Sequence, residues 1–152
     1  MEAAVRRACS VFEEMGDLGH LSGFLALLAD VLADMGRFEE AESQAARAWS
    51  MSADSDVMDQ ILLRRARAKI LAARGDLESA VRTGREAVEL THGIQDTDLQ
   101  AGVWMDLGPI FNEAGRQAEA IDLATQAVEM WERKGNLVRA ARAREVLRSM
   151  SA

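Results

Sequence analysis

The sequence has few of the residues that catalysis, metal binding or disulfide formation require. It contains one cysteine, two histidines and one proline in 152 residues. Cys9 has no second cysteine to pair with, which favours a reducing compartment, and its place in an amphipathic stretch indicates a small buried side chain. His20 and His92 are far apart and have no cysteine or acid cluster at ligand spacing. We therefore expect no metal site.

Motifs for cofactor binding and nucleophilic catalysis are also missing. The sequence has no glycine-rich phosphate loop and no locally supported serine–histidine–aspartate arrangement, so we expect no cofactor and no enzyme activity. No apolar run approaches the roughly 18 residues of a membrane span. The first residues carry acids instead of the continuous apolar core of a secretory signal. We expect a cytoplasmic chain with no membrane partner.

The charge is acidic and unevenly distributed. The net charge of −7 is opposite to what a nucleic-acid-binding surface requires, so we expect no nucleic-acid partner. Residues 131–152 nevertheless carry a net +4, which leaves −11 for the rest of the chain. This basic last segment predicts either a docking surface for an acidic partner or a solvated helix face. Basic residues other than Lys69 and Lys134 are all arginine, as is typical of GC-rich bacterial genes.

What the sequence does contain is helix-forming residues at helical spacing. Alanine and leucine dominate, and apolar residues recur on single stripes. The pattern predicts eight helices, over residues 2–15, 18–35, 37–51, 56–74, 77–91, 97–114, 117–134 and 136–150. Consecutive helices are separated by a glycine followed by an N-cap residue at Gly16-Asp17, Gly75-Asp76 and Gly135-Asn136. We expect Asp54 or Ser55 to cap the fourth helix, and Thr97 with Gln100 resembles a capping box.

Equivalent small residues recur at a nearly constant period. Gly36, Gly75 and Gly115 are 39 and then 40 residues apart, and alanines repeat the interval at 41, 80 and 120 and at 48, 87 and 127. Small residues let helix backbones approach closely. A helix pair cannot bury its apolar face alone, so the repeat predicts stacked pairs that share a core. Large residues fill that core, and we expect Trp104, Phe111 and Trp131 there.

The residues at these positions resemble the tetratricopeptide repeat (TPR) family. The best copy contains Trp104, Leu107, Gly108, Phe111, Gly115, Ala120 and Ala127. The resemblance implies an all-α, right-handed α-solenoid of antiparallel helix pairs. Its repeats would span 18–51, 56–91 and 97–134, with an N-terminal helix at 2–15 and a C-terminal capping helix at 136–150. The first helix corresponds to the second helix of a repeat, which implies a fragment or an N-terminal cap.

The period is longer than the 34 residues usual for the family and resembles its 40-residue subclass. Residues 65–80, 85–90 and 127–147 are similar to the C-terminal TPR region of actinobacterial multidomain regulators. The resemblance implies a non-enzymatic scaffold, part of a larger bacterial signalling protein, that binds a protein or peptide in a concave groove. By family register the groove residues are Asp30, Asp34, Leu62, Arg65, Lys69, Met105, Pro109, Asn112 and Glu113. A merely solvated inner face is the alternative.

One pair of residues departs from the family pattern, and one proline lies inside a predicted helix. Arg64 and Arg67 stand where the family packs large apolar residues. Either their side-chain stems extend along the surface so that the guanidinium groups pair with helix acids, or the two arginines form an anion site between the first two repeats. Pro109 lies within the predicted sixth helix, where it removes one backbone hydrogen bond and introduces a kink.

Two further functions remain open from the sequence. A pocket lined by Arg64, Arg65, Arg67 and Lys69 would favour a small-ligand sensor that changes superhelix shape. The terminal helices would instead support an oligomerisation element, such as a homodimer.

Overall fold

The computed structural model describes residues 1–51 and 56–151. Within these ranges the chain forms eight α-helices and no strand. Their bounds are α1 Glu2–Met15, α2 Leu18–Asp34, α3 Phe38–Met51, α4 Val57–Ala73, α5 Leu77–Thr91, α6 Thr97–Glu113, α7 Gln117–Arg133 and α8 Leu137–Ser151. Every bound lies within one residue of its predicted position. The prediction of an all-α chain is therefore confirmed.

The three glycines that define the period have the same structural role. Gly36, Gly75 and Gly115 follow the ends of α2, α4 and α6 with φ angles of 73°, 83° and 79°. A residue with a β-carbon is strained in this left-handed region, so glycine ends the helix at little cost. The predicted N-caps at Asp17 and Asp76 are confirmed, since each side chain accepts a backbone N–H hydrogen bond of 3.2 Å.

Asp56 caps α4. Its Oδ1 accepts a hydrogen bond from the backbone N–H of Met58 at 2.9 Å. The predicted caps Asp54 and Ser55 lie outside the described residues. Asp56 can act as the cap because it directly precedes Val57, the first helical residue, so its carboxylate reaches an N–H group without an intrahelical partner.

The predicted capping box of α6 is wrong. Asp96 caps this helix by accepting the backbone N–H of Leu99 at 3.0 Å. Gln100 is instead buried, and its Nε2 donates a hydrogen bond of 3.1 Å to the carbonyl oxygen of Thr91. This carbonyl is at the end of α5, where it lacks an intrahelical partner, so it competes successfully for the glutamine side chain.

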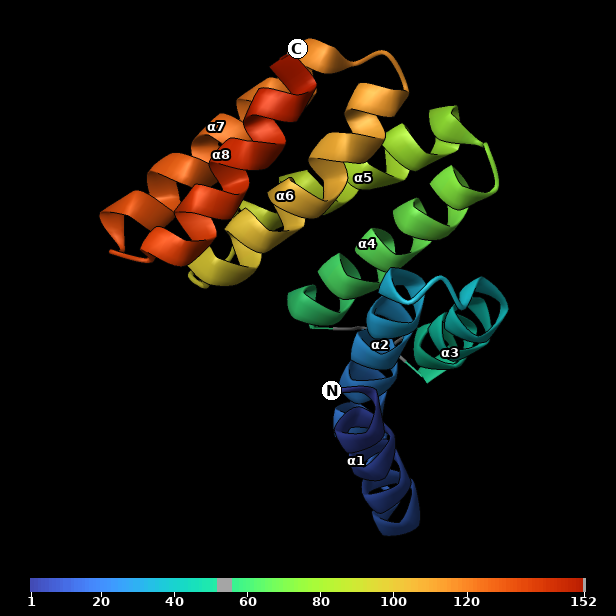
Figure 1. Cartoon of the computed structure of the whole chain (residues 1–152). Coiled ribbons are helices and arrows are strands. Elements are labelled where there is room, and N and C mark those ends of the chain that lie inside the picture. The colour runs from blue at the N-terminus through green and yellow to red at the C-terminus, as the bar shows by residue number, and fades with distance from the viewer. Residues whose placement is uncertain (52–55, 152) are drawn as a thin grey trace.

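The helices form an α-solenoid of stacked helix pairs. α2 packs with α3, α4 with α5 and α6 with α7, and the first helices of successive pairs stack through α2–α4 and α4–α6 contacts. α1 covers α2 at one end and α8 covers α7 at the other. Figure 1 shows α1 at one extremity of the molecule, with α7 and α8 at the opposite extremity. No helix of the described chain is long and apolar enough to cross a membrane.

The buried side chains form two clusters that meet at α4. Ile61 and Ala68 belong to the cluster shared with α5–α8, whereas Leu63, Ala66 and Ile70 belong to the cluster shared with α1–α3. α4 is therefore apolar on two faces, and its basic residues are confined to the two narrow stripes between them. The predicted core positions Trp104, Phe111 and Trp131 are confirmed, with exposures of 3%, 2% and 5% respectively.

Candidate functional site

Five charged side chains from α2, α4 and α6 form one ion-pair network. Asp30 lies at its centre, with its side chain only 4% exposed. Its Oδ1 accepts hydrogen bonds from Arg65 Nε at 3.0 Å and from Lys69 Nζ at 2.9 Å. Lys69 Nζ also lies 2.6 Å from Asp34 Oδ1 and 3.2 Å from Asp106 Oδ2. Arg65 Nη1 lies 3.6 Å from the same Asp106 oxygen. The network therefore connects the first helices of three successive pairs.

Helical spacing explains why these groups meet. Asp30 and Asp34 are one turn apart on α2, and Arg65 and Lys69 are one turn apart on α4. Residues at i and i+4 share a helix face, so two acids on one helix face two bases on the next. Asp106 approaches the same bases from α6. The stacking of the helix pairs thus brings together groups that are far apart in the sequence.

The network keeps its two bases charged despite their burial. Burial lowers the pKa of Lys69, but the carboxylates of Asp30 and Asp106 outweigh this effect and hold the pKa above its ordinary value. Burial likewise lowers the pKa of Arg65, but the charge of Asp30, the hydrogen bond it accepts from Arg65 and the charges of Asp106 and Asp34 together outweigh this effect and raise the pKa. Buried charges are tolerated only when they are paired in this way. Both bases are therefore committed to carboxylates of the chain itself.

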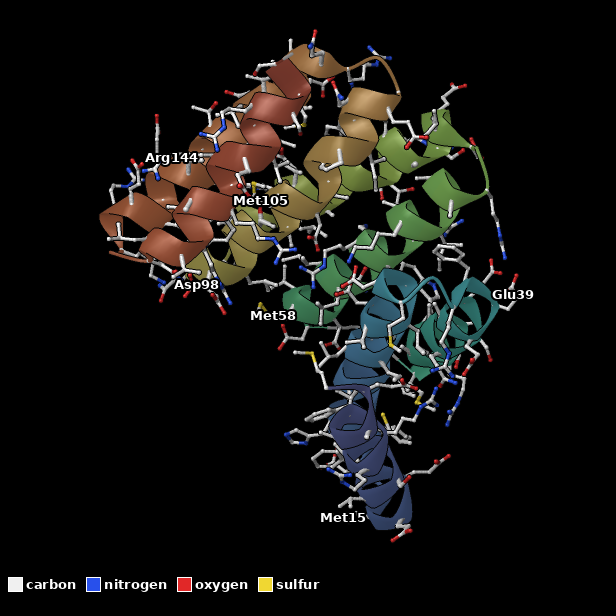
Figure 2. The ribbon with its side chains drawn as sticks, in the orientation of Figure 1. Met15, Glu39, Met58, Asp98, Met105 and Arg144 are labelled. Atoms are coloured by element: carbon white, nitrogen blue, oxygen red, sulfur yellow. The ribbon has the colours of Figure 1, made fainter. Side chains whose placement is uncertain are left out.

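Two adjoining hollows run along α6 and form what we call the α6 groove. The larger, of about 580 Å³, lies between α6 and α8, and the smaller, of about 350 Å³, lies between α6 and the ends of α2 and α4. Met105 and Asp106 line both hollows. Figure 2 shows Met105 on the side of α6 that faces α8. Leu99 and Val146 add further apolar lining to the larger hollow.

The end of the groove beside α8 is basic. Arg139 and Arg142 line the larger hollow and are both exposed. Arg139 lies over the Trp131 ring, with its Cζ 5.9 Å from the ring centroid, and its Nη1 is 3.8 Å from Asp98 Oδ1. Asp98 also accepts hydrogen bonds from Lys134 Nζ at 3.0 Å and from Trp131 Nε1 at 3.1 Å. Arg142 makes no ion pair with any residue that the structure describes.

The structure brings most of the predicted groove residues to this region. Asp34, Lys69, Met105 and Pro109 line the smaller hollow and Arg65 lines the larger one, whereas Asp30 lies beneath the surface in the ion-pair network. Leu62 lines a separate hollow of about 680 Å³ near the start of α2. Asn112 and Glu113 line none of these three hollows.

Arg64 and Arg67 lie on the other polar stripe of α4. Arg64 Nε donates to Glu86 Oε2 of α5 at 3.1 Å, and its guanidinium also contacts the Gln60 side chain. Its Cζ lies 5.6 Å from the centroid of the Trp49 ring in α3. This arrangement matches the interpretation in which an arginine stem extends to helix acids. Arg67 is exposed at the surface.

Sequence reasoning did not assign three residues to the groove: Asp106, Arg139 and Arg142. Asp106 could have been found, because it precedes the predicted groove residues Pro109 and Glu113 by three and seven residues and therefore shares a helix face with them. The two arginines were recognised only as part of a basic last segment. Their place in the groove depends on how α8 packs against α6 and α7, which sequence spacing does not specify.

The histidines have local partners. His20 Nδ1 lies 2.7 Å from Asp17 Oδ2, and His92 packs near Trp104 with ring centroids 6.2 Å apart. The described residues contain no cluster of three or more histidine, cysteine or acidic side chains that could hold a metal ion. The sequence matches no protein-family model and no curated protein.

Proposed function

We propose that this chain is a TPR-type protein-interaction module and that the α6 groove binds a peptide or partner segment with acidic and apolar side chains. The observation that carries this proposal is a groove with an apolar lining and two exposed arginines at one end, Arg139 and Arg142. Grooves of this kind bind peptides through side-chain pockets and charge complementarity.

The equivalence of the repeats supports the assignment to the TPR family. The alanines at 41, 80 and 120 and those at 48, 87 and 127 are all fully buried where helices meet. The glycines at 36, 75 and 115 share one backbone conformation. Repeats whose equivalent positions have equivalent roles are what a solenoid of stacked units requires.

The charge distribution favours an acidic partner segment. Arg65 and Lys69, the bases in the middle of the predicted groove, already have carboxylate partners from α2 and α6. A peptide gains little by competing for them, because it would leave Asp30 buried without a counter-ion. Arg142 has no such intramolecular partner in the described chain, so it is the base best suited to receive a carboxylate.

The proposed setting is a larger cytoplasmic bacterial regulator in which the module acts as a non-enzymatic scaffold. The buried network would keep the three first helices at fixed relative positions, so the groove is largely pre-formed. Pre-organisation reduces the conformational entropy lost on binding and thereby raises affinity.

Fluorescence anisotropy with synthetic peptides tests the proposal. We expect peptides that combine glutamates with leucines to bind, and matched peptides with lysines in place of glutamates to bind weakly. Arg142→Glu should lower the affinity for the acidic peptides about tenfold, equivalent to about 1.4 kcal/mol. Arg148→Glu is the matched control, because it makes the same charge change on α8 at an exposed position that lines none of the three hollows. Equal losses in the two variants, or no preference for acidic peptides, would contradict the proposal.

The structure gives less support to a small-ligand sensor. Arg65 and Lys69 line different hollows and are neutralised by acids, while Arg64 is directed to Glu86 of α5. The four bases that would favour such a sensor therefore do not converge on one of the three hollows described above.

A further inference from the structure

α1 has a second apolar stripe beside the row of residues that packs on α2. Its inner face packs on α2 through Val5, Cys9 and Phe12. The outer stripe consists of Ala4, Ala8, Val11 and Met15, and Val11 and Met15 are 51% and 69% exposed. Large apolar side chains at this exposure are worth explaining when they form a continuous row. The N-terminal Met1, 88% exposed, continues the row beyond the start of the helix.

The spacing of this stripe is that of a coiled-coil seam. Its residues are separated by alternating steps of four and three, which places them at the a and d positions of a heptad. The other terminal helix lacks this pattern. The exposed large apolar residues of α8 are Leu137 and Val138, which are adjacent in its first turn and so point in different directions.

The charges beside the stripe indicate the partner. Ala8 and Met15 are the a positions of the stripe. Arg7 and Glu14 directly precede them, so both occupy the same flanking position of the heptad, g. Both are exposed, and neither forms an ion pair with another residue of the described chain. In an antiparallel pair of helices the g flanks face each other, which sets Arg7 against Glu14 of the other helix twice. In a parallel pair, each would face the flank that already packs on α2.

We propose that α1 pairs antiparallel with α1 of a second copy of this chain and forms a homodimer. The stripe is then self-complementary, as a two-fold interface requires. Ala4 and Ala8 permit close approach of the two helices, and Val11 and Met15 fill the seam. Figure 1 shows α1 at the extremity of the molecule, on the far side from α6, α7 and α8. The surface is therefore separate from the α6 groove, and the inference is independent of the proposed function.

The size of the stripe sets the strength of the dimer. α1 has 14 residues, which corresponds to a length of about 21 Å. An interface of this length falls at the small end of specific protein interfaces, below about 1,200 Å². The dimer should therefore be reversible and depend on protein concentration.

Sedimentation velocity of the whole chain over a range of concentrations tests the proposal. We expect the apparent mass to rise from the 16.6 kDa of one chain toward twice that value as concentration increases. Val11→Glu should keep the protein monomeric, and its circular dichroism spectrum should be unchanged because the side chain is half exposed. Val138→Glu on α8 is the control and should leave the dimer intact.

Charge exchange tests the antiparallel orientation. Arg7→Glu and Glu14→Arg should each weaken dimerisation about tenfold, because each converts two attractive pairs into repulsive ones. An equimolar mixture of the two variants should restore dimerisation, since both g-flank pairs become complementary again in the mixed dimer. A strictly monomeric wild-type chain, a dimer that survives Val11→Glu, or a mixture no stronger than its components would overturn the proposal.

Discussion

Replacing Asp30 with asparagine should destabilise the fold far more than the same change at Asp34. Both residues are on α2, one turn apart, and both contact Lys69. Their side chains are 4% and 57% exposed respectively. The two substitutions thus remove the same charge from the same network and differ mainly in burial.

The magnitude follows from what remains around the bases. Removing one member of a buried ion pair costs about 3–5 kcal/mol when the other charge is left without compensation. Here Asp34 and Asp106 remain near Lys69, at 2.6 Å and 3.2 Å from its Nζ. We therefore expect Asp30→Asn to lower the free energy of unfolding by about 2–3 kcal/mol. Asp34→Asn breaks an exposed pair and should cost less than about 1 kcal/mol.

Thermal unfolding followed by circular dichroism at neutral pH measures the difference. For a chain of this size about 1 kcal/mol corresponds to roughly 2–4 °C in Tm, so Asp30→Asn should lower Tm by about 5–10 °C. Asp34→Asn should lower it by less than about 3 °C. Similar shifts in the two variants would show that Asp30 is not the buried centre of the network and would refute the reasoning.

Three other predictions concern stability. Gly84→Ala should lower it by about 1–2 kcal/mol, because the new Cβ would lie 2.8 Å from Cε1 of the buried Phe111 ring. Gly102→Ala, whose nearest neighbour would be 4.0 Å away, should instead raise it by up to about 1 kcal/mol through helix propensity. Equal effects in urea titrations would contradict this packing. Pro109→Ala should raise stability by about 2 kcal/mol, since an alanine restores the backbone donor within α6; a lower urea midpoint would refute it. Acid should destabilise the fold. A hydrogen bond from a neighbouring arginine lowers the pKa of Glu119. The ionised Glu119 therefore stabilises the fold above the ordinary carboxylate pKa near about 4, and this contribution is lost as pH falls through the lowered pKa. Unfolding free energies measured from neutral pH to about pH 3 check the direction, and a rise on acidification would contradict it.

Helix positions were predictable from the sequence because their determinants are local. Spacing of apolar residues defines each helix, and glycine followed by aspartate marks where one helix ends and the next begins. These signals act within a few residues, so all eight helices appear within one residue of the predicted bounds. The capping box at Thr97 was wrong for the complementary reason. Gln100 faces a carbonyl of the preceding helix. A local sequence pattern cannot predict a contact between two helices.

The candidate site was only partly predictable. The family register predicted Arg65 and Lys69 as groove residues, but it did not indicate which acids they pair with. The structure pairs both with Asp30 and Asp106. Which charges neutralise each other depends on distances between helices, and these distances depend on how the pairs stack.

The sequence by itself thus determined the helices, their ends and the stacking of equivalent pairs, because period and amphipathic pattern leave a helix pair no way to bury its apolar face alone. Only the tertiary structure decided which charged groups are paired inside the fold and which remain available to a partner. Arg142 at the groove, and Arg7 and Glu14 on α1, remain exposed because no acid or base of a neighbouring helix is packed against them in the described chain. Whether a charged side chain is available to a partner depends on the groups that pack beside it in the fold, and residue type alone does not determine this.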